Sequence, residues 1–286
     1  MGNPHAKKRL VIARRILDAY PTGASLDVFF VAGSVGAGLA DRWSDLEIDC
    51  YWDHAPSDSE RLAPISALGA DLTTLWPYDQ ADQEFSEDYV LDGLDVTISN
   101  FTCASVDAMI ADMHDHGTIS DATQYRFASM TRSRVLSGGD TVEAWRQRIE
   151  PMLDQVVASI VEHELSPHSL PGWNVRTALV ERGDVIAVRG LLASVGRAVF
   201  HAVLAANRFY RPHRIAKWQY SLLGECALLP ERFDEDLDGL WGTDVSVALS
   251  HAERLVLNTL ALTEGVLGGD LPGIRAGLES QRNDRE

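Results

Sequence analysis

Three acidic residues alternate with apolar residues directly after a glycine-rich segment, in the stretch 33–50 (GSVGAGLADRWSDLEIDC). Asp45, Glu47 and Asp49 stand at every second position, and such alternation predicts a β-strand whose successive side chains point to opposite faces. The three carboxylates would then share one face, where like charges repel unless a cation lies between them. This segment therefore predicts either a solvated edge strand or a metal-binding face.

A later hairpin supplies a further acid. The run 89–99 (YVLDGLDVTIS) places Asp92 and Gly93 between two β-prone segments, which is the signal of a tight hairpin turn. Asp95 follows on the second arm between apolar neighbours. Carboxylates from two neighbouring strands can hold two Mg²⁺ ions, since Mg²⁺ prefers oxygen ligands and keeps positions open for phosphate oxygens.

The glycine-rich segment suits a phosphate group. A short strand predicted at 26–32 runs directly into Gly33 and Ser34. Glycine lets the backbone approach a triphosphate closely, and the serine hydroxyl and neighbouring N–H groups can donate hydrogen bonds to it. Together with a Mg²⁺ site, this arrangement is typical of phosphoryl or nucleotidyl transfer.

These residues resemble the polymerase β-type nucleotidyltransferase superfamily. Its signature is a hydrophobic residue, a Gly-Gly or Gly-Ser pair, a gap of roughly nine to thirteen residues, Asp-x-Asp/Glu, and a third carboxylate on a later strand. Here the gap is ten residues, 35–44, and Ala32 is only weakly hydrophobic. Over residues 28–99 the chain looks most like small bacterial aminoglycoside and lincosamide nucleotidyltransferases, which carry a helical C-terminal domain.

The resemblance implies a set of site residues. Asp45 and Glu47 are expected to bridge two Mg²⁺ ions, and Asp95 to complete the metal site nearest the attacking hydroxyl, so that all three are catalytic and metal-binding. Gly33 and Ser34 are expected to bind the NTP substrate, with ATP as the expected nucleotide.

The second part of the chain has a helical pattern. Helical periodicity recurs in the segments 106–116, 121–131, 143–165, 184–206, 214–228 and 246–265. We therefore predict an α+β fold with two domains. A nucleotidyltransferase head with a mixed sheet would occupy residues 1–105, and a C-terminal helical bundle residues 106–286.

A basic and aromatic segment, 206–218, lies within the helical part. Basic residues at a helix end are compatible with the helix dipole alone. The resemblance implies instead that a lysine and a tyrosine of this part hold the triphosphate, for which Lys217 and Tyr210 are the candidates. Asp184 is expected to cap the following helix, and the sequence leaves open whether Asp184 or Asp49 takes part in the reaction.

Charge and composition limit the classes of molecule that the protein is expected to bind. With 25 basic and 42 acidic residues the net charge is −17, which repels nucleic acid and favours a cationic or neutral small-molecule acceptor such as an aminoglycoside. The N-terminus lacks the apolar core of a signal peptide, and no apolar run approaches the ~18 residues of a membrane span, so we expect a cytoplasmic protein without a membrane partner. The three cysteines are widely spaced and are expected to be reduced thiols.

Alternatives stay open at this point. The acceptor can be an RNA or a protein side chain, as in toxin or regulator members of the superfamily, or the chain can be a non-catalytic nucleotide-binding module. A dinucleotide-binding loop is excluded because LADRWS is too short for the helix that such a fold requires. A P-loop is excluded because the nearest lysines are Lys8 and Lys217. The acceptor, the transferred base, the general base and the assembly of a homodimer are not readable from the residues.

Overall fold

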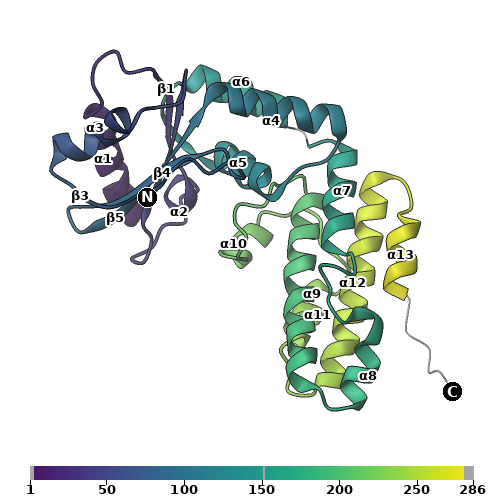
Figure 1. The fold of residues 1–286 in the computed structure, drawn as a ribbon. Helices are drawn as coiled ribbons and strands as arrows, with labels where there is room; N and C mark the ends of the chain where they lie inside the picture. Colours follow the sequence, from purple (N-terminus) through teal and green to yellow (C-terminus); the bar gives the residue numbers. More distant parts are fainter. Residues whose placement is uncertain (1–2, 151, 280–286) are drawn as a thin grey trace. The chain divides into compact units, whose positions relative to one another are not determined.

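The computed structural model describes residues 3–150 and 152–279. The chain divides into two compact units, which we call unit 1 and unit 2 (Figure 1). Unit 1 comprises Met1–His116 and Ser120–Pro151, and unit 2 comprises Gly117–Ile119 and Met152–Glu286. Unit 1 contains a sheet with helices and unit 2 contains helices, which confirms the predicted α+β class.

Unit 1 is built on a six-stranded mixed sheet in the order β3-β4-β5-β2-β1-β6. The strands are β1 (Leu26–Val31), β2 (Leu46–Trp52), β3 (Asp71–Leu75), β4 (Phe85–Leu91), β5 (Leu94–Thr102) and β6 (Arg134–Ser137). β2 and β5 are parallel, and the other neighbouring pairs are antiparallel. The predicted strands around the glycine-rich segment and the predicted hairpin are confirmed, whereas β6 was not predicted.

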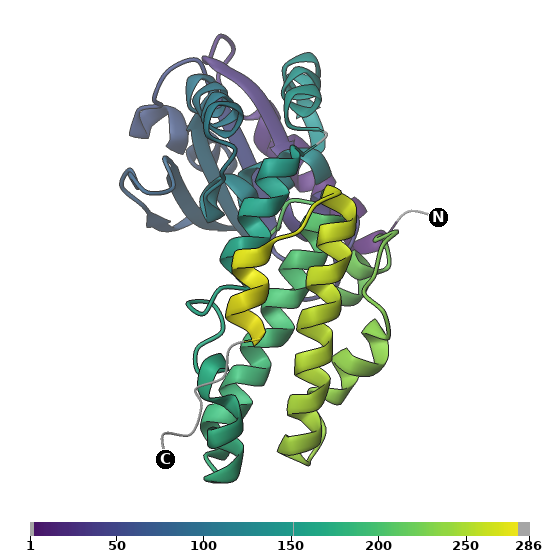
Figure 2. The same ribbon diagram turned by 90° about the vertical axis from the view of Figure 1, so that its right-hand side faces the viewer.

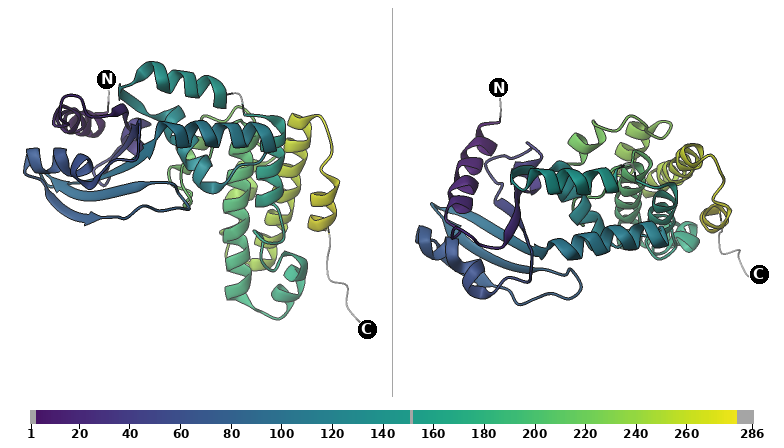
Figure 3. Two further views of the ribbon diagram at one scale, coloured as in Figure 1. Left: turned by 45° about the horizontal axis from the view of Figure 1, so that its top comes forward. Right: turned by 90° about the horizontal axis from the view of Figure 1, so that it is seen from above.

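Helices cover both faces of this sheet (Figure 3). They are α1 (Pro4–Asp18), α2 (Gly33–Gly36), α3 (Asp58–Leu68), α4 (Cys103–His116), α5 (Asp121–Arg132) and α6 (Gly139–Ile149). On one face, Ile16 of α1 and Ile65 of α3 pack with Ile48 and Ile98 of the strands in the main apolar core. On the other face, the ring of Trp145 in α6 lies 5.2 Å from that of Tyr51 in β2.

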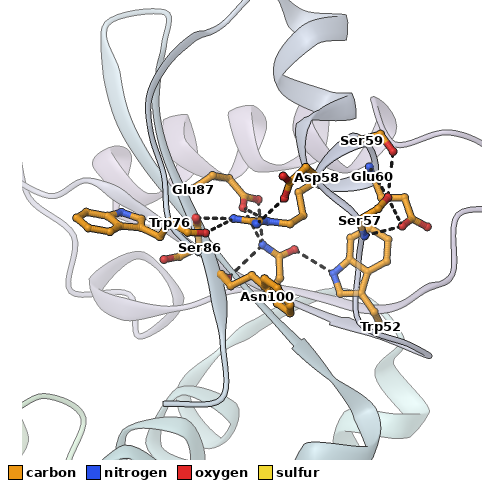
Figure 4. Close-up of polar contacts among 11 residues, drawn as sticks. Trp52, Ser57, Asp58, Ser59, Glu60, Trp76, Ser86, Glu87 and Asn100 are labelled. Carbon is orange, nitrogen blue, oxygen red and sulfur yellow. Dashed lines mark hydrogen bonds and ion pairs between the residues drawn. The ribbon is translucent and has the colours of Figure 1, made fainter. Parts of the chain in front are cut away.

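A buried polar network lies under α3 (Figure 4). Arg61 Nε donates to Glu87 Oε2 (2.9 Å), Asn100 Nδ2 donates to the same carboxylate (3.0 Å), and Trp52 Nε1 donates to Asn100 Oδ1 (2.9 Å). Arg61 Nη2 also donates to the backbone oxygen of Trp76 (3.1 Å). Burial raises the pKa of Glu87 to about 7, although Asn100 and Arg61 both act to lower it. These hydrogen bonds link α3 to β4, to β5 and to the end of β3.

The predicted domain boundary at residue 105 differs from the division seen in the structure. β6 pairs with β1, with Phe30 opposite Val135, and α4, α5 and α6 belong to unit 1. The physical reason is that the second face of the sheet carries an aromatic region, including Tyr51 and Phe101, which these later helices bury. The predicted helix at 143–165 is accordingly two helices, α6 and α7, which belong to different units.

Unit 2 is helical, as predicted (Figure 2). It contains α7 (Asp154–Glu164), a short 3-10 turn (Trp173–Val175), α8 (Arg176–Glu181), α9 (Val185–Ala206), α10 (Gln219–Leu223), α11 (Phe233–Gly239), α12 (Val245–Leu267) and α13 (Pro272–Glu279). α9 packs against α7 and α12. The segment 214–228, predicted as a helix, holds only the five residues of α10, because Trp218 has a left-handed conformation (φ +56°) where that helix begins.

One helix in the described part of the chain, α9, is long and apolar enough to cross a membrane by length and composition. Of its most apolar window, 56% is buried inside the structure. Its buried residues include Leu192, Val195 and Val199, which contribute to the interior of unit 2. Packing within unit 2 therefore explains the apolar composition of α9.

Candidate active site

The parallel register of β2 and β5 brings the predicted acids to neighbouring positions. Glu47 of β2 pairs with Thr97 of β5, and Asp95 lies two residues before Thr97 on β5. Asp45 directly precedes β2, two residues before Glu47. Paired residues on neighbouring strands point to the same face of a sheet. Asp45, Glu47 and Asp95 therefore share one face, which we call the carboxylate face.

The carboxylate face is covered at one end and open at the other. Towards the end of β2 it is covered by aromatic side chains, and the rings of Tyr51 and Phe101 lie 5.2 Å apart. At the start of the strands Asp45 and Asp95 are exposed, and Glu47 is half-buried. The three predicted catalytic acids thus lie in the part of the face that solvent and a substrate can reach.

The glycine-rich segment lies directly against this open part. Ala32 N–H donates to the carbonyl of Glu47 (2.9 Å), and the chain then turns into α2 at Gly33, whose φ is +54°. A Cβ at Gly33 would lie 1.6 Å from Glu47 Oε2. A Cβ at Gly36 would lie 2.3 Å from the carbonyl oxygen of Val31, so α2 also packs closely on the end of β1. The structure therefore brings Gly33 beside Glu47. The Glu47 carboxylate fits there because Gly33 has no side chain.

The donor set has the chemistry of a Mg²⁺ site, because carboxylate oxygens are the ligands that Mg²⁺ prefers. Within residues 3–150 and 152–279, however, no group of three Asp, Glu, His or Cys side chains is arranged to hold a metal ion. The backbone places Asp45, Glu47 and Asp95 on one face, and their oxygen atoms do not converge. The exposed side chains of Asp45 and Asp95 can reach other rotamers without disturbing the core.

Asp49, the third acid of the alternating segment, has different surroundings. It is 6% exposed and accepts a hydrogen bond from Ser129 Oγ of α5 (2.7 Å). Arg126 Nη1 of the same helix lies 3.8 Å from Asp49 Oδ2. Burial raises the pKa of Asp49, while Arg126 and Ser129 act in the opposite direction.

A further acid on the same face, Asp88 of β4, was not predicted from the sequence. It pairs with Thr97, whose Oγ1 donates to Asp88 Oδ1 (2.7 Å), and the half-exposed Trp76 donates from Nε1 to Asp88 Oδ2 (2.7 Å). The alternation of side chains along β4 could have predicted this position. Val90 pairs with Asp95, and Asp88, two residues earlier on β4, points to the same face as Val90.

Two predicted nucleotide-binding residues belong to unit 2. Lys217 is exposed and lies between α9 and α10, whereas Tyr210 is buried, with 4% of its surface exposed. The acids, Gly33 and Ser34 belong to unit 1. A role of Lys217 and Tyr210 in binding the nucleotide stays a prediction.

Comparison with known proteins gives limited matches. Residues 120–219 match the model of a family described as a domain of unknown function, DUF4037, and this span does not include the predicted acids. No curated protein matches the chain. Among solved structures, a nucleotidyltransferase-like protein from Exiguobacterium sibiricum 255-15 is similar, with a TM-score of 0.41 and 10% sequence identity. The similarity covers 89% of this chain and 77% of that one.

Proposed function

We propose that the chain is a metal-dependent nucleotidyltransferase. It would transfer a nucleoside monophosphate, AMP from ATP, to a hydroxyl group of a small molecule such as an aminoglycoside-like antibiotic, and release pyrophosphate. The observation that supports this most is the register of β2 and β5, which pairs Glu47 with Thr97 on the face that also carries Asp95, with Asp45 directly before β2. Gly33 lies against Glu47, so the phosphate-binding segment and the acids of the sequence motif belong to one surface.

The proposed reaction assigns a part to each of these residues. Two Mg²⁺ ions, when bound, supply charge neutralisation of the triphosphate and align the α-phosphorus with the attacking hydroxyl oxygen. Asp45 and Glu47 would hold both ions, and Asp95 the one nearest the acceptor. Backbone N–H groups of the segment that begins at Gly33, and the hydroxyl of the half-buried Ser34, would donate hydrogen bonds to phosphate oxygens.

A small acceptor is favoured over a nucleic acid by charge. The chain carries a net charge of −17, and the open part of the carboxylate face presents acidic side chains. Such a surface attracts cationic amino sugars and repels a phosphate backbone. In this proposal Lys217 and Tyr210 of unit 2 contribute to triphosphate binding.

The test is Mg²⁺-dependent release of pyrophosphate. Each of the four NTPs is combined with a panel of aminoglycosides, lincosamides and bulk tRNA, for the wild-type chain and for Asp45→Asn. We expect release that needs one NTP together with one small acceptor, and its loss in the variant. Release with tRNA alone would show a macromolecular acceptor, and NTP binding without release would show a non-catalytic module.

A matched control separates loss of a ligand from loss of an acidic charge. Asp18 is an exposed acid of unit 1 at the end of α1, a helix that packs on the opposite face of the sheet. Asp18→Asn removes the same charge as Asp45→Asn and should retain activity. Thermal unfolding of both variants checks that each is folded, and equal loss of activity in the two would contradict the assignment of Asp45.

A further inference from the structure

Trp76, directly after β3, is an exposed aromatic residue that is held in a fixed position. It is 50% exposed, yet its backbone N–H donates to the carbonyl of Ser86 (2.9 Å) and its carbonyl accepts from Arg61 Nη2 (3.1 Å). Its indole Nε1 donates to Asp88 Oδ2 (2.7 Å), so the side chain is held as well. Pro77 follows, and a proline keeps the residue before it in an extended conformation. The ring points away from the buried network under α3 (Figure 4) and is presented to solvent.

The carboxylate of Asp88 is fixed from two sides. Thr97 Oγ1 donates to Oδ1 and Trp76 Nε1 donates to Oδ2, each over 2.7 Å. An ionised carboxylate can accept about four hydrogen bonds, so both oxygen atoms can accept a further one. The two donors are neutral and do not cancel the charge of the carboxylate. Asp88 is half-buried, so a ligand in solution can reach this charge.

Residues with hydroxyl groups surround Asp88 on the same face. Asp88 pairs with Thr74 on one side and Thr97 on the other, and Ser86 pairs with Ser99. Paired residues, and residues two apart on one strand, point to the same face of a sheet. We call this half-buried group, with Trp76 at its edge, the polar shelf: Thr74, Ser86, Asp88, Thr97 and Ser99.

The chemistry of the polar shelf suits an amino sugar. An indole face attracts an organic cation, and a fixed carboxylate accepts charge-assisted hydrogen bonds from an ammonium group. The hydroxyl groups can donate to and accept from the hydroxyl groups of a sugar ring. A nucleotide would also find an aromatic ring here, but the acidic side chains and the net charge of −17 repel its phosphates and attract a cation.

We propose that Trp76 and Asp88 form a binding site for an amino-sugar acceptor. An amino group binds Asp88 and lies against the indole, and ring hydroxyls bind the polar shelf. The class of ligand rests on the proposed function, whereas binding at this site needs neither a metal ion nor a nucleotide. The inference adds that the acceptor lies over β4 and β5, where Asp95 precedes Thr97 by two residues on the same strand.

The experiment titrates the full chain with neamine, a two-ring amino sugar, in the absence of Mg²⁺ and nucleotide. The indole N–H signal of Trp76 in a nitrogen-15 NMR spectrum is identified by its absence in Trp76→Phe. We expect this signal to shift and to saturate, because its acceptor Asp88 also binds the ligand. By calorimetry, Asp88→Asn should weaken binding about tenfold or more, as expected for a hydrogen bond to a charged group. Trp76→Ala should weaken binding about threefold, as expected for an exposed cation–π contact.

Matched controls separate this site from general attraction to an acidic protein. Asp18→Asn removes the same charge from an exposed position of α1, and Trp43→Phe changes another exposed tryptophan, which is 80% exposed. Both variants should bind neamine as the wild type does. Sucrose, a neutral two-ring sugar, should leave the Trp76 signal in place, and spermidine, a linear polyamine, should bind more weakly than neamine.

Three results would overturn the inference. These are a Trp76 signal that does not shift at saturating neamine, an unchanged affinity in a folded Asp88→Asn, and binding of sucrose or spermidine as tight as that of neamine. If Asp88→Asn fails to fold, as judged by thermal unfolding, Trp76→Ala decides, because the ring that it removes is half-exposed. Weaker binding of neamine in that variant supports the inference, and unchanged binding contradicts it.

Pyrophosphate release separates this inference from the proposed function. Neamine that binds at Trp76 without release of pyrophosphate from any NTP, in the presence of Mg²⁺, would support the binding site and contradict nucleotidyl transfer to amino sugars. Release with neamine, at a KM for neamine that is the same in the wild type and in Asp88→Asn, would support the transfer and contradict the binding site.

Discussion

Glu47 occupies the space that a side chain at Gly33 would need. A Cβ there would lie 1.6 Å from Glu47 Oε2 and 2.7 Å from its Cδ. Gly33→Ala should therefore displace the carboxylate and abolish nucleotidyl transfer. The cost in unfolding free energy should be only about 1–2 kcal/mol, the usual penalty for a left-handed alanine, because the far end of the Glu47 side chain can move. Pyrophosphate release and urea unfolding measure the two effects.

Gly38 provides the control for this substitution. It also has a positive φ (+75°), but a Cβ at Gly38 would meet no atom within 4 Å. Gly38→Ala should cost about the same stability and retain activity, because only the backbone strain is shared. An equal loss of activity in both variants would mean that the contact with Glu47 is unimportant.

The neighbouring acids at the start of β2 and β5 should weaken the metal-free fold. Asp45 and Asp95 are both exposed, and each directly precedes a residue of the first pair in the parallel register, Leu46 and Val96. Like charges on paired strands are unfavourable, so Asp95→Asn should raise the unfolding free energy by about 0.2–1 kcal/mol in low salt, and by less in high salt. Mg²⁺ should stabilise the wild type more than the variant. Urea unfolding at two salt concentrations, with and without Mg²⁺, checks this, and a less stable variant would contradict it.

Local sequence signals predicted the elements that carry the site. The alternation over 46–52 and the Asp92-Gly93 turn are short-range patterns, and the turn residues adopt the expected positive φ values of +54° and +73°. β6 has only four residues and pairs with β1 about a hundred positions away in sequence, with Val135 opposite Phe30. Such a pairing leaves no local pattern, so β6 was not predicted and the predicted boundary at residue 105 differs from the division into units.

The same distinction applies to the candidate site. Alternation alone placed Asp45, Glu47 and Asp49 on one face, and the register of β2 with β5 places Glu47 and Asp49 there. The different surroundings of Asp49 depend on Ser129, a residue 80 positions away. That contact arises from the packing of α5 on the sheet, which composition and periodicity do not encode.

Glu87 should make stability depend on pH. It is fully buried beside Arg61 and Asn100, and its pKa is raised from 4.5 to about 7. Between these two values the folded chain keeps a proton that the unfolded chain loses. The contribution of this group to stability is therefore complete below pH 4.5 and is lost as pH rises to about 7, a change of about 3 kcal/mol. Glu87→Gln should flatten that part of the curve in urea unfolding between pH 4.5 and 8. A difference between wild type and variant that does not change with pH would contradict this.

Unit 1 should fold as an independent fragment only if it extends beyond α6. A fragment of residues 1–150 contains β6, which pairs with β1, and α6, whose Trp145 packs on Tyr51. A fragment of residues 1–105 lacks both β6 and α6. It would expose the aromatic end of the carboxylate face to water, and such an apolar surface promotes association. We expect cooperative urea unfolding and dispersed amide NMR signals for the longer fragment, and aggregation or a non-cooperative transition for the shorter one. Cooperative unfolding of the shorter fragment would mean that the helices after β5 are dispensable for the sheet, and would restore residue 105 as the end of the folding unit.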